Sequence, residues 1–586
     1  MHPLLSLVAV SGLALSWIGS LSAHGEAASP NRPEAEAWRA AGRMVDLHQH
    51  VTSTPEHLER AVRILDRVGV GVAANLSGGT VTPRDGGASA FERNKALADR
   101  LAPGRFVLYF QLDYTGWDEA DFGERGARQV EEAHRLGAAG LKEFKRLGLY
   151  LRDGKGELIR IDDPKLDPVW RRCGELGMPV SIHVADPKAF WDPFNETNER
   201  WKELRDHRPW WFGDAAVYPP REALLEALDR VIARHPGTTF VCVHFANNAE
   251  DLDWVERKLD ARPNMLADLA ARIPEIGRHP PERVHRLFRK HADRIVFATD
   301  FQVHNKLILG SSGDDERPTD DDAVDFFGKH WRWLETWDRD FAHMTPIQGD
   351  WTISGIGLPP EVLRKVYFDN ARRLLARFLP EPVLRARRLR GGAGGDGKPT
   401  DAAWEQARAV WMDQNSLDAG ARAELSTEVR ALWTSEDLYL RFESPYTRLT
   451  VFEPAEPGIE RIGLWERDVV EAFIGTDASE PRRYTEFQVA PNGMKLDLRL
   501  NLPERDFAWS SGFETEVRVD EAGKRWTAVM RIPLRSLAER LPEGGTRWRI
   551  NLYRCDYAND GFLAWRPTLA RTFHVPERFG ILEFED

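Results

Sequence analysis

The sequence predicts a mixed α/β protein in which a (β/α)8 TIM barrel is followed by an antiparallel β-sandwich domain. Between residues 44 and 300, short apolar runs alternate with amphipathic stretches. Near-continuous apolar strands separated by helices are typical of a parallel sheet that is buried on both faces. Beyond about residue 400, strand-like runs follow one another without full-length helices between them, which indicates an antiparallel sandwich.

Eight strands are expected in the first region, and eight strand–helix units in roughly 250 residues favour a closed barrel over an open sheet. An open dinucleotide-binding fold is also disfavoured because no Gly-x-Gly-x-x-Gly follows the first strand. The first helix is expected to begin at Pro55, which suits the first helical turn. The expected strands are Val45–His50, Gly71–Leu76, Phe106–Asp113, Ala139–Lys145, Pro179–Val184, Thr239–Phe245, Asn264–Leu269 and Arg294–Asp300.

The composition excludes several classes of protein. A net charge of −12 over 586 residues argues against a nucleic-acid partner, which requires a basic face. The three cysteines, Cys173, Cys242 and Cys555, are too few and too scattered for a disulfide framework. We therefore look for function among the polar residues at the strand ends.

The chain divides into five predicted segments. An apolar stretch followed by small residues is typical of a secretory signal peptide and predicts export to the periplasm or the extracellular space. Its start lacks Lys and Arg, so a retained membrane anchor stays open as the alternative; no later segment reaches the ~18 apolar residues of a membrane span. The segments are the signal peptide (1–23), a spacer (24–43), the barrel (44–380), a Pro/Gly-rich linker (381–400) and the sandwich (401–586).

Four histidines and one aspartate stand at the predicted ends of four barrel strands. His48 and His50 are two residues apart on the first strand, so their side chains point to the same side. His183, His244 and Asp300 end the fifth, sixth and eighth strands. Residues in these positions meet at the carboxyl-terminal face of a barrel, where active sites lie. Imidazole and carboxylate ligands suit Zn²⁺ or Mn²⁺, so the sequence predicts a metal site.

This order of motifs resembles the amidohydrolase superfamily, and more narrowly its amidohydrolase-related branch, over roughly residues 43–380. The resemblance implies that His48, His50, His183 and Asp300 bind one divalent metal, zinc first and manganese second. It also implies that His244 stands beside the metal as an acid/base or carbonyl-polarising residue. Asp300 and His244 would then be the catalytic residues, with Asp300 passing a proton from water to the leaving group.

The resemblance implies hydrolysis of a small ester, lactone or amide, including carbohydrate-derived ones, by attack of metal-bound hydroxide. Two alternatives remain open. One is a metal-dependent nonoxidative decarboxylase with the same ligands. The other is a non-catalytic carbohydrate-binding surface protein whose barrel is a scaffold.

Lys142, on the fourth strand, has two interpretations. In binuclear relatives a lysine at this position is carboxylated and bridges two metals; alternatively, its ammonium contacts a substrate carboxylate or pairs with Glu143. Tryptophans on the two long insertions, residues 187–218 and 301–351, either form a ligand platform or pack the loops. Further polar residues at strand ends are candidates for lining the pocket: Asn75, Asp113, Asp186 and Asn247.

The second region resembles family 9 carbohydrate-binding modules over about residues 401–586. The motifs that carry the resemblance include Trp465–Glu471 and Val489–Gly493. Trp465, Trp509 and Trp565 are candidates for stacking on a sugar, with core packing as the alternative for each. Asp468 and Glu471 either bind Ca²⁺ or are structural. The expected partners are therefore a small-molecule substrate and a carbohydrate.

Overall fold

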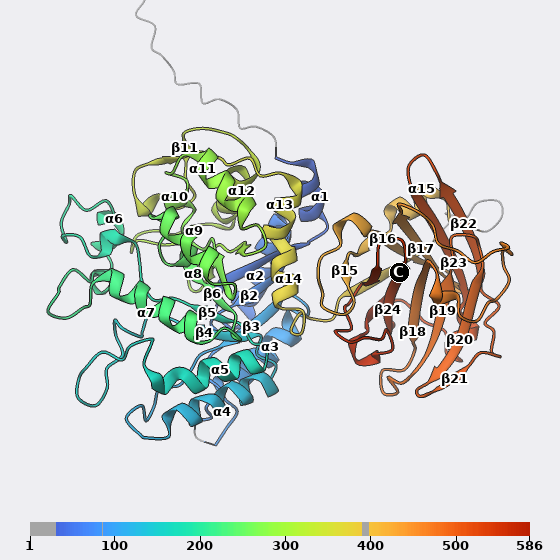
Figure 1. Ribbon diagram of the computed structural model, residues 1–586, viewed down its shortest axis with the longest axis horizontal. Helices are drawn as coiled ribbons and strands as arrows, with labels where there is room; N and C mark the ends of the chain where they lie inside the picture. The colour runs from blue at the N-terminus through green and yellow to red at the C-terminus, as the bar shows by residue number, and fades with distance from the viewer. Residues whose placement is uncertain (1–30, 85, 390–397) are drawn as a thin grey trace, which may run out of the picture.

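The computed structural model describes residues 31–84, 86–389 and 398–586, and it contains the two predicted domains side by side (Figure 1). The barrel, coloured blue to yellow, precedes a domain of strands coloured orange to red. The predicted signal peptide lies outside the described residues. Within the part of the chain that is described, no helix combines the length and apolarity needed to cross a bilayer.

The parallel strands of the predicted barrel form in the expected order. Strands β1 to β8 are hydrogen-bonded neighbours in sequence order. The eighth predicted strand is shorter than expected, since only β8 falls within it, and β9 follows after its predicted end. Asp300, between the two, has a left-handed backbone that no strand can continue through. The strands are β1 (Met44–Val51), β2 (Val70–Asn75), β3 (Phe106–Phe110), β4 (Gly140–Glu143), β5 (Val180–Ile182), β6 (Phe240–Cys242), β7 (Met265–Asp268), β8 (Ile295–Val296) and β9 (Phe301–Val303).

The ring of strands closes between β1 and the segment that links β8 to β9. Strand β9 pairs in parallel with β1, with His50 opposite Gln302. Two backbone hydrogen bonds continue this contact, from Leu47 N–H to the Phe297 carbonyl at 3.1 Å and from Asp300 N–H to the His48 carbonyl at 2.9 Å. Closure therefore brings the carboxyl ends of the first and last strands together.

Helices cover the outside of the barrel. The helix that follows β1 begins where predicted, since Pro55 opens α2 and the Thr54 side chain caps it; Gly69, in the left-handed conformation, ends it. The helices are α1 (Pro33–Ala40), α2 (Pro55–Val68), α3 (Ala90–Leu101), α4 (Phe122–Arg135), α5 (Asp167–Glu175), α6 (Trp201–Leu204), α7 (Arg221–Arg234), α8 (Val243–Ala246), α9 (Leu252–Ala261), α10 (Ile273–Ile276), α11 (Pro281–Lys290), α12 (Asp320–Glu335), α13 (Pro360–Arg364) and α14 (Asn370–Leu374).

The two long insertions pack against each other over the barrel. The insertion after β5 contains α6, and the one after β8 contains β10 (Leu307–Leu309), α12, β11 (Phe341–Ala342) and β12 (Thr352–Ile353). Buried Arg200 of the first insertion pairs with Glu203 and Glu275, and Ser311 of the second donates to Glu203. Trp331 and Trp333 are buried on α12, so these two tryptophans pack the insertion and do not form a ligand platform.

The second domain is a sandwich of mainly antiparallel strands around its own core. Trp433, Phe487 and Leu582 are among the side chains buried there. Its strands are β13 (Val383–Arg388), β14 (Val410–Met412), β15 (Gln414–Asn415), β16 (Thr427–Trp433), β17 (Asp437–Pro445), β18 (Val469–Gly475), β19 (Arg483–Val489), β20 (Lys495–Asn501), β21 (Glu504–Asp506), β22 (Glu514–Asp520), β23 (Arg525–Pro533), β24 (Arg547–Asp556), β25 (Gly561–Ala564) and β26 (Gly580–Glu585), with the short helices α15 (Asp401–Gln406) and α16 (Leu534–Leu537).

Two segments differ from the sequence interpretation. Val383–Arg388, assigned to the linker, forms strand β13 and pairs in parallel with β26 and β16 of the sandwich. Pro33–Ala40, assigned to the spacer, forms α1, and Arg39 on this helix pairs with buried Glu335. Strand β13 forms through contacts with distant parts of the chain. Pro33–Ala40, by contrast, has its own helix signals, Pro33 at the first helical position and several Ala and Glu residues, which the spacer interpretation overlooked.

One buried carboxylate joins the two domains. Asp413, between β14 and β15, receives hydrogen bonds from Arg43, Arg364 and Arg372 of the barrel. Burial alone raises the pKa of Asp413, but the charges of these three arginines outweigh burial and hold its pKa well below the usual range. The ionised carboxylate is therefore a structural part of the contact between the domains.

We expect Asp413→Asn to lower the free energy of unfolding by about 3–5 kcal/mol at pH 7, because it leaves buried guanidinium groups without their anion. Since the folded pKa lies below the unfolded value of ~3.9, this stabilisation is complete above that value and is lost as the pH falls further. The measurement is urea unfolding of both proteins at pH 7 and pH 3. Equal stabilities at pH 7, or a difference as large at pH 3, would contradict the assignment; exposed Glu521→Gln is the control.

Candidate functional site

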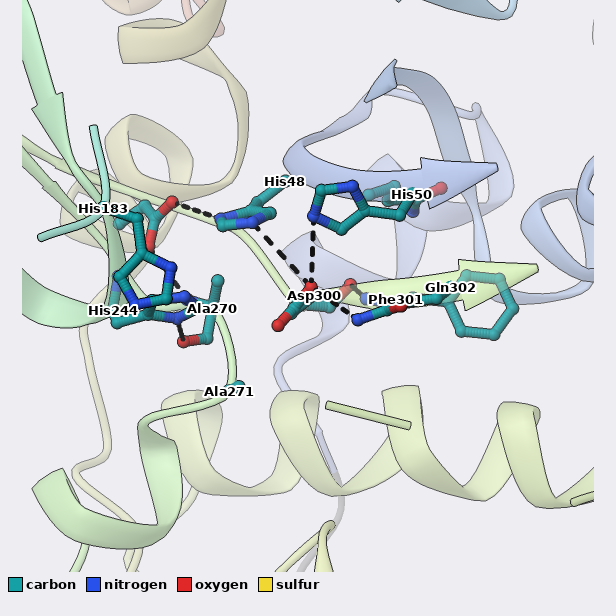
Figure 2. Close-up of polar contacts among 12 residues, drawn as sticks. His48, His50, His183, His244, Ala270, Ala271, Asp300, Phe301 and Gln302 are labelled. Atoms are coloured by element: carbon teal, nitrogen blue, oxygen red, sulfur yellow. Dashed lines mark hydrogen bonds and ion pairs between the residues drawn. The ribbon is translucent and has the colours of Figure 1, made fainter. Parts of the chain in front are cut away.

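The five predicted strand-end residues converge at the carboxyl-terminal end of the barrel (Figure 2). The side chains of His48 and His50 both face Asp300, with Nε2 atoms 3.8 and 3.6 Å from its Oδ1 atom. The rings of His183 and His244 lie together, with centroids 4.4 Å apart, and His244 lies 5.2 Å from His48. Residues more than 250 positions apart in the sequence therefore surround one point.

Each of three imidazoles is held by a hydrogen bond at its Nδ1 atom. His48 Nδ1 lies 2.9 Å from an oxygen of Asp268, and His50 Nδ1 lies 2.8 Å from the Ser77 hydroxyl. His244 Nδ1 lies 2.7 Å from the carbonyl oxygen of Ala270. A partner at one ring nitrogen fixes the ring's orientation and leaves the other nitrogen to bind a metal.

The backbone is left-handed at two of the site residues. His244 begins a left-handed turn in which His244, Phe245, Ala246 and Asn247 have φ values of 55°, 52°, 61° and 57°. Asp300 has a φ of 59°. Such conformations cost of order 1–3 kcal/mol per residue and persist only where the surrounding contacts hold them. The turn also explains why β6 ends at Cys242, earlier than predicted, since a left-handed residue cannot continue a strand.

Asp46 on β1 holds the segment that carries Asp300. Its carboxylate accepts hydrogen bonds from the Thr299 hydroxyl at 2.6 Å and from the Thr299 N–H at 3.2 Å. It also accepts from the His48 N–H and the Gln49 side chain at 3.1 and 2.8 Å. One buried carboxylate thus fixes the relative positions of two elements that contribute to the site.

Burial keeps the imidazoles neutral. It lowers the pKa of His48, His50 and His244 well below the usual range, and that of His183 to about 4. Burial also raises the pKa of Asp300 to about 7. Neutral imidazole is the form that binds a metal, and a cation beside Asp300 would favour its ionised form.

The donor set fits a divalent metal. It includes His244, which the sequence interpretation placed beside the metal and not among its ligands. Donor atoms of His48, His244 and Asp300 all lie within 4.8 Å of one another. His183 instead has its Nε2 atom 3.2 Å from Asp186. His48 and Asp300 are therefore common to this group and to the predicted ligand set, and His50 contacts the same Asp300 oxygen. The choice of His183 or His244 as a further ligand stays a prediction.

Positive side chains border the centre. Lys142 is 1% exposed and its ammonium has no hydrogen-bond partner among the described residues; burial lowers its pKa to about 8. Lys145 pairs with Asp186, and buried Arg272 lies 3.7 Å from the same carboxylate. Asp186 thus balances the charges of Lys145 and Arg272, and the Lys142 ammonium is the cation at this site that favours a substrate with negative charge.

The other predicted pocket residues have mainly structural contacts. Asn75 bonds to both the N–H and the carbonyl of Val51 and so joins β1 to β2. Asn247 accepts from the Val184 N–H, and Asp113 accepts from Thr115. Asp186 alone of the four contacts a candidate ligand, His183.

Sequence reasoning missed Asp268 and Ser77, which orient His48 and His50. A signal for Asp268 was present, because it ends the seventh strand of the barrel just as Asp300 follows the eighth. Ser77 lies after β2, where nothing in the sequence distinguishes it from an ordinary loop serine.

The second domain contains a pocket of about 650 Å³ that is lined by Trp465, Phe507, Tyr557 and other aromatic residues. Three oxygens at this pocket, on Glu471, Glu486 and Gln488, are buried and have no hydrogen-bond partner among the described residues. Burial raises the pKa of both glutamates, and the charge of Glu486 raises that of Glu471 further. Ligand hydroxyl groups would satisfy these oxygens.

Trp465 lies at this pocket, whereas the other two predicted tryptophans do not. Trp565 is 6% exposed and packs in the core, and Trp509 packs on the core with the Arg499 guanidinium 4.6 Å from its ring centre. The calcium prediction gains no support from Asp468, since its two carboxylate oxygens accept the N–H groups of Thr450 and Tyr557.

We expect Asp268→Asn to weaken metal binding by about 10–100-fold, because the hydrogen bond that orients His48 loses its charge. The measurement is the zinc and manganese dissociation constant of the purified protein by competition with a chelator. Asp253→Asn, whose side chain is 74% exposed, is the matched control. Unchanged affinity in Asp268→Asn would show that the orientation of His48 does not depend on this carboxylate.

Comparison with known proteins gives matches to both domains. Residues 45–377 match the family model for amidohydrolases, and residues 396–586 match the model for carbohydrate family 9 binding domain-like proteins. An extracellular protein of Arthroderma benhamiae is 27% identical over 176 residues, which cover 27% of this chain and 78% of the relative.

Each domain is also similar to solved structures, among them the following two. A 2,6-dihydroxybenzoate decarboxylase from Rhizobium covers 57% of this chain and 98% of its own, with 15% identity and a TM-score of 0.32. A family 9 carbohydrate-binding module from Caldicellulosiruptor kristjanssonii, in complex with cellotriose, covers 35% of this chain and 94% of its own, with 14% identity and a TM-score of 0.26. Because the family model spans more than half of its length, the chain belongs to the amidohydrolase family and carries a second domain of the family 9 carbohydrate-binding type.

Proposed function

We propose that the barrel is a metal-dependent hydrolase of a small ester, lactone or amide. The observation that carries the proposal is the convergence of neutral, oriented imidazoles on the buried carboxylate of Asp300. His48, His50 and Asp300 would hold the ion, completed by His183 or His244, and zinc is the first choice for such ligands. A divalent ion there supplies a Lewis acid and lowers the pKa of water.

Residues of the chain would transfer the proton, stabilise the substrate oxygen and bind the substrate. Asp300 can accept a proton from the attacking water and return it to the leaving group, because its carboxylate borders the centre and is only 9% exposed. An imidazole of His244 or His183 that does not bind the ion can donate to the substrate oxygen that gains charge. Lys142, whose ammonium has no partner in the described residues, can hold a carboxylate of the substrate; its carboxylation remains the alternative.

We further propose that the chain is exported. The apolar segment at residues 4–23 supports this, as does the name of the relative from Arthroderma benhamiae, an extracellular protein. An exported enzyme that carries a carbohydrate-binding domain would meet its small substrate near a polysaccharide.

To test the barrel's activity, the zinc-loaded and manganese-loaded protein is assayed on lactones, esters, amides and aromatic acids. We expect hydrolysis, and a decrease in kcat/KM of about 10²–10⁴-fold in Asp300→Asn. Asp321→Asn, whose side chain is 86% exposed, is the control.

The products decide between the alternatives. Release of CO2 from an aromatic acid would show that the reaction is decarboxylation and not hydrolysis, with the same metal ligands. No turnover of any of these substrates by protein with a full complement of metal would contradict both enzymatic proposals and favour a non-catalytic, carbohydrate-binding role.

We also propose that the second domain binds a carbohydrate in the pocket beside Trp465. The supporting observation is the combination of aromatic side chains with buried, unsatisfied oxygens of Glu471, Glu486 and Gln488. Sugar rings stack on aromatic faces, and sugar hydroxyl groups donate hydrogen bonds to such oxygens.

Calorimetric titration with cellotriose tests this pocket. We expect Trp465→Ala to weaken binding by about tenfold or more, because it removes the apolar surface on which a sugar ring stacks. Trp509→Ala is the matched control and should leave the affinity unchanged. Equal weakening by both substitutions would place the sugar elsewhere.

A further inference from the structure

A cleft of about 590 Å³ lies between the two domains, at the amino-terminal face of the barrel. Met44 and Val70, at the starts of β1 and β2, line it on the barrel side. Trp411 and Trp565 line it on the side of the second domain. This interdomain cleft is opposite the candidate metal centre, which lies at the carboxyl ends of the strands, and it is distinct from the pocket beside Trp465.

The interdomain cleft has an excess of arginine side chains over carboxylates although the chain as a whole is acidic. Six of its arginines pair with carboxylates that line the cleft or lie behind it, and within the described residues two do not. Eight arginines line it, against two carboxylates, Asp66 and Glu381. Both carboxylates are already paired, Asp66 with Arg105 at 2.6 Å and Glu381 with Arg566 at 3.3 Å. A cleft with an excess of one sign of charge concentrates counter-ions from solution.

Two of these arginines have no carboxylate within ion-pair distance among the described residues. Arg408 is exposed, and its guanidinium lies against Gly42. Arg578 donates only to the carbonyl oxygens of Pro567 and Ala376, at 3.0 and 2.7 Å. Burial and the nearby charge of Arg566 together lower the pKa of Arg578 to about 10.

Domain contact alone does not require this excess of charge. The buried contact at Asp413 uses Arg43, Arg364 and Arg372, and among the described residues only Arg364 of these three pairs with a second carboxylate, Asp369. Further unpaired guanidinium groups beside it repel one another and lose hydration, both of which destabilise the closed interface. An anion between them would reverse both effects.

We propose that the interdomain cleft binds a small molecule that bears two or more anionic oxygen groups. Guanidinium groups bind carboxylate, sulfate and phosphate oxygens through paired hydrogen bonds. The volume is within the range of small-molecule sites, and the indole side chains that line it suit a ligand with an apolar part. Such a ligand would also strengthen the contact between the domains, since arginines of both contribute to the site.

Calorimetric titration of the full chain tests this site with three probes: digalacturonate, inorganic pyrophosphate and neutral cellobiose. We expect at least one of the two anions to bind, with an affinity that falls at higher ionic strength. We expect Arg408→Gln to weaken that binding by about tenfold or more. Arg408 is exposed and has no ion pair in the described residues, so the substitution should leave the thermal unfolding temperature unchanged; Arg540→Gln, whose side chain is 91% exposed, is the control.

The two anions and three further variants separate the outcomes. Binding of digalacturonate alone identifies a carboxylate ligand such as an acidic saccharide, and binding of pyrophosphate alone identifies a phosphate ester; either supports the site. Asp300→Asn and Trp465→Ala should retain the affinity for the anion, because their sites are elsewhere. The proposal is overturned if neither anion binds, if Arg408→Gln and Arg578→Gln bind as well as the wild type, or if Asp300→Asn abolishes binding.

Discussion

The candidate site depends on the closure of the barrel at Asp46. This buried carboxylate binds Thr299, beside Asp300, and also the backbone of His48. Its hydrogen bonds bring the last strand segment to the first strand, and only then do His48, His50 and Asp300 face one another (Figure 2). The left-handed conformations of His244 and Asp300 are maintained within this closed frame, where neighbouring hydrogen bonds offset their cost.

Much of the fold was predictable because its signals are local. The apolar runs gave all eight barrel strands, and Pro55 gave the start of α2. The four histidines and Asp300 were predictable as a set, since each follows an apolar run and parallel strands share one carboxyl end. Strand β13 was not predictable: its residues read as linker and become a strand only through pairing with β26 and β16.

The arrangement of the side chains within the site could not be predicted from the sequence for a related reason. The left-handed turn at His244 depends on tertiary contacts, and it brings this histidine to within 4.8 Å of His48 and Asp300, whereas His183 contacts Asp186. The positions of the two histidines thus depend on backbone conformation, which residue types do not encode. For the same reason the sequence did not distinguish tryptophans of the sandwich core from those of its pocket. Trp465, which lines the pocket, and Trp565, which packs in the core, were therefore equal candidates.

Anomalous diffraction from crystals grown with zinc, collected on both sides of the zinc edge, tests the central claim most directly. The account predicts one strong peak within ~2.0–2.3 Å of ligand atoms of His48, His50 and Asp300, with His183 or His244 as a further ligand. The same map would show which of the two histidines binds the ion. A protein without a peak there, or with its ion bound only at another group of residues, would contradict the account.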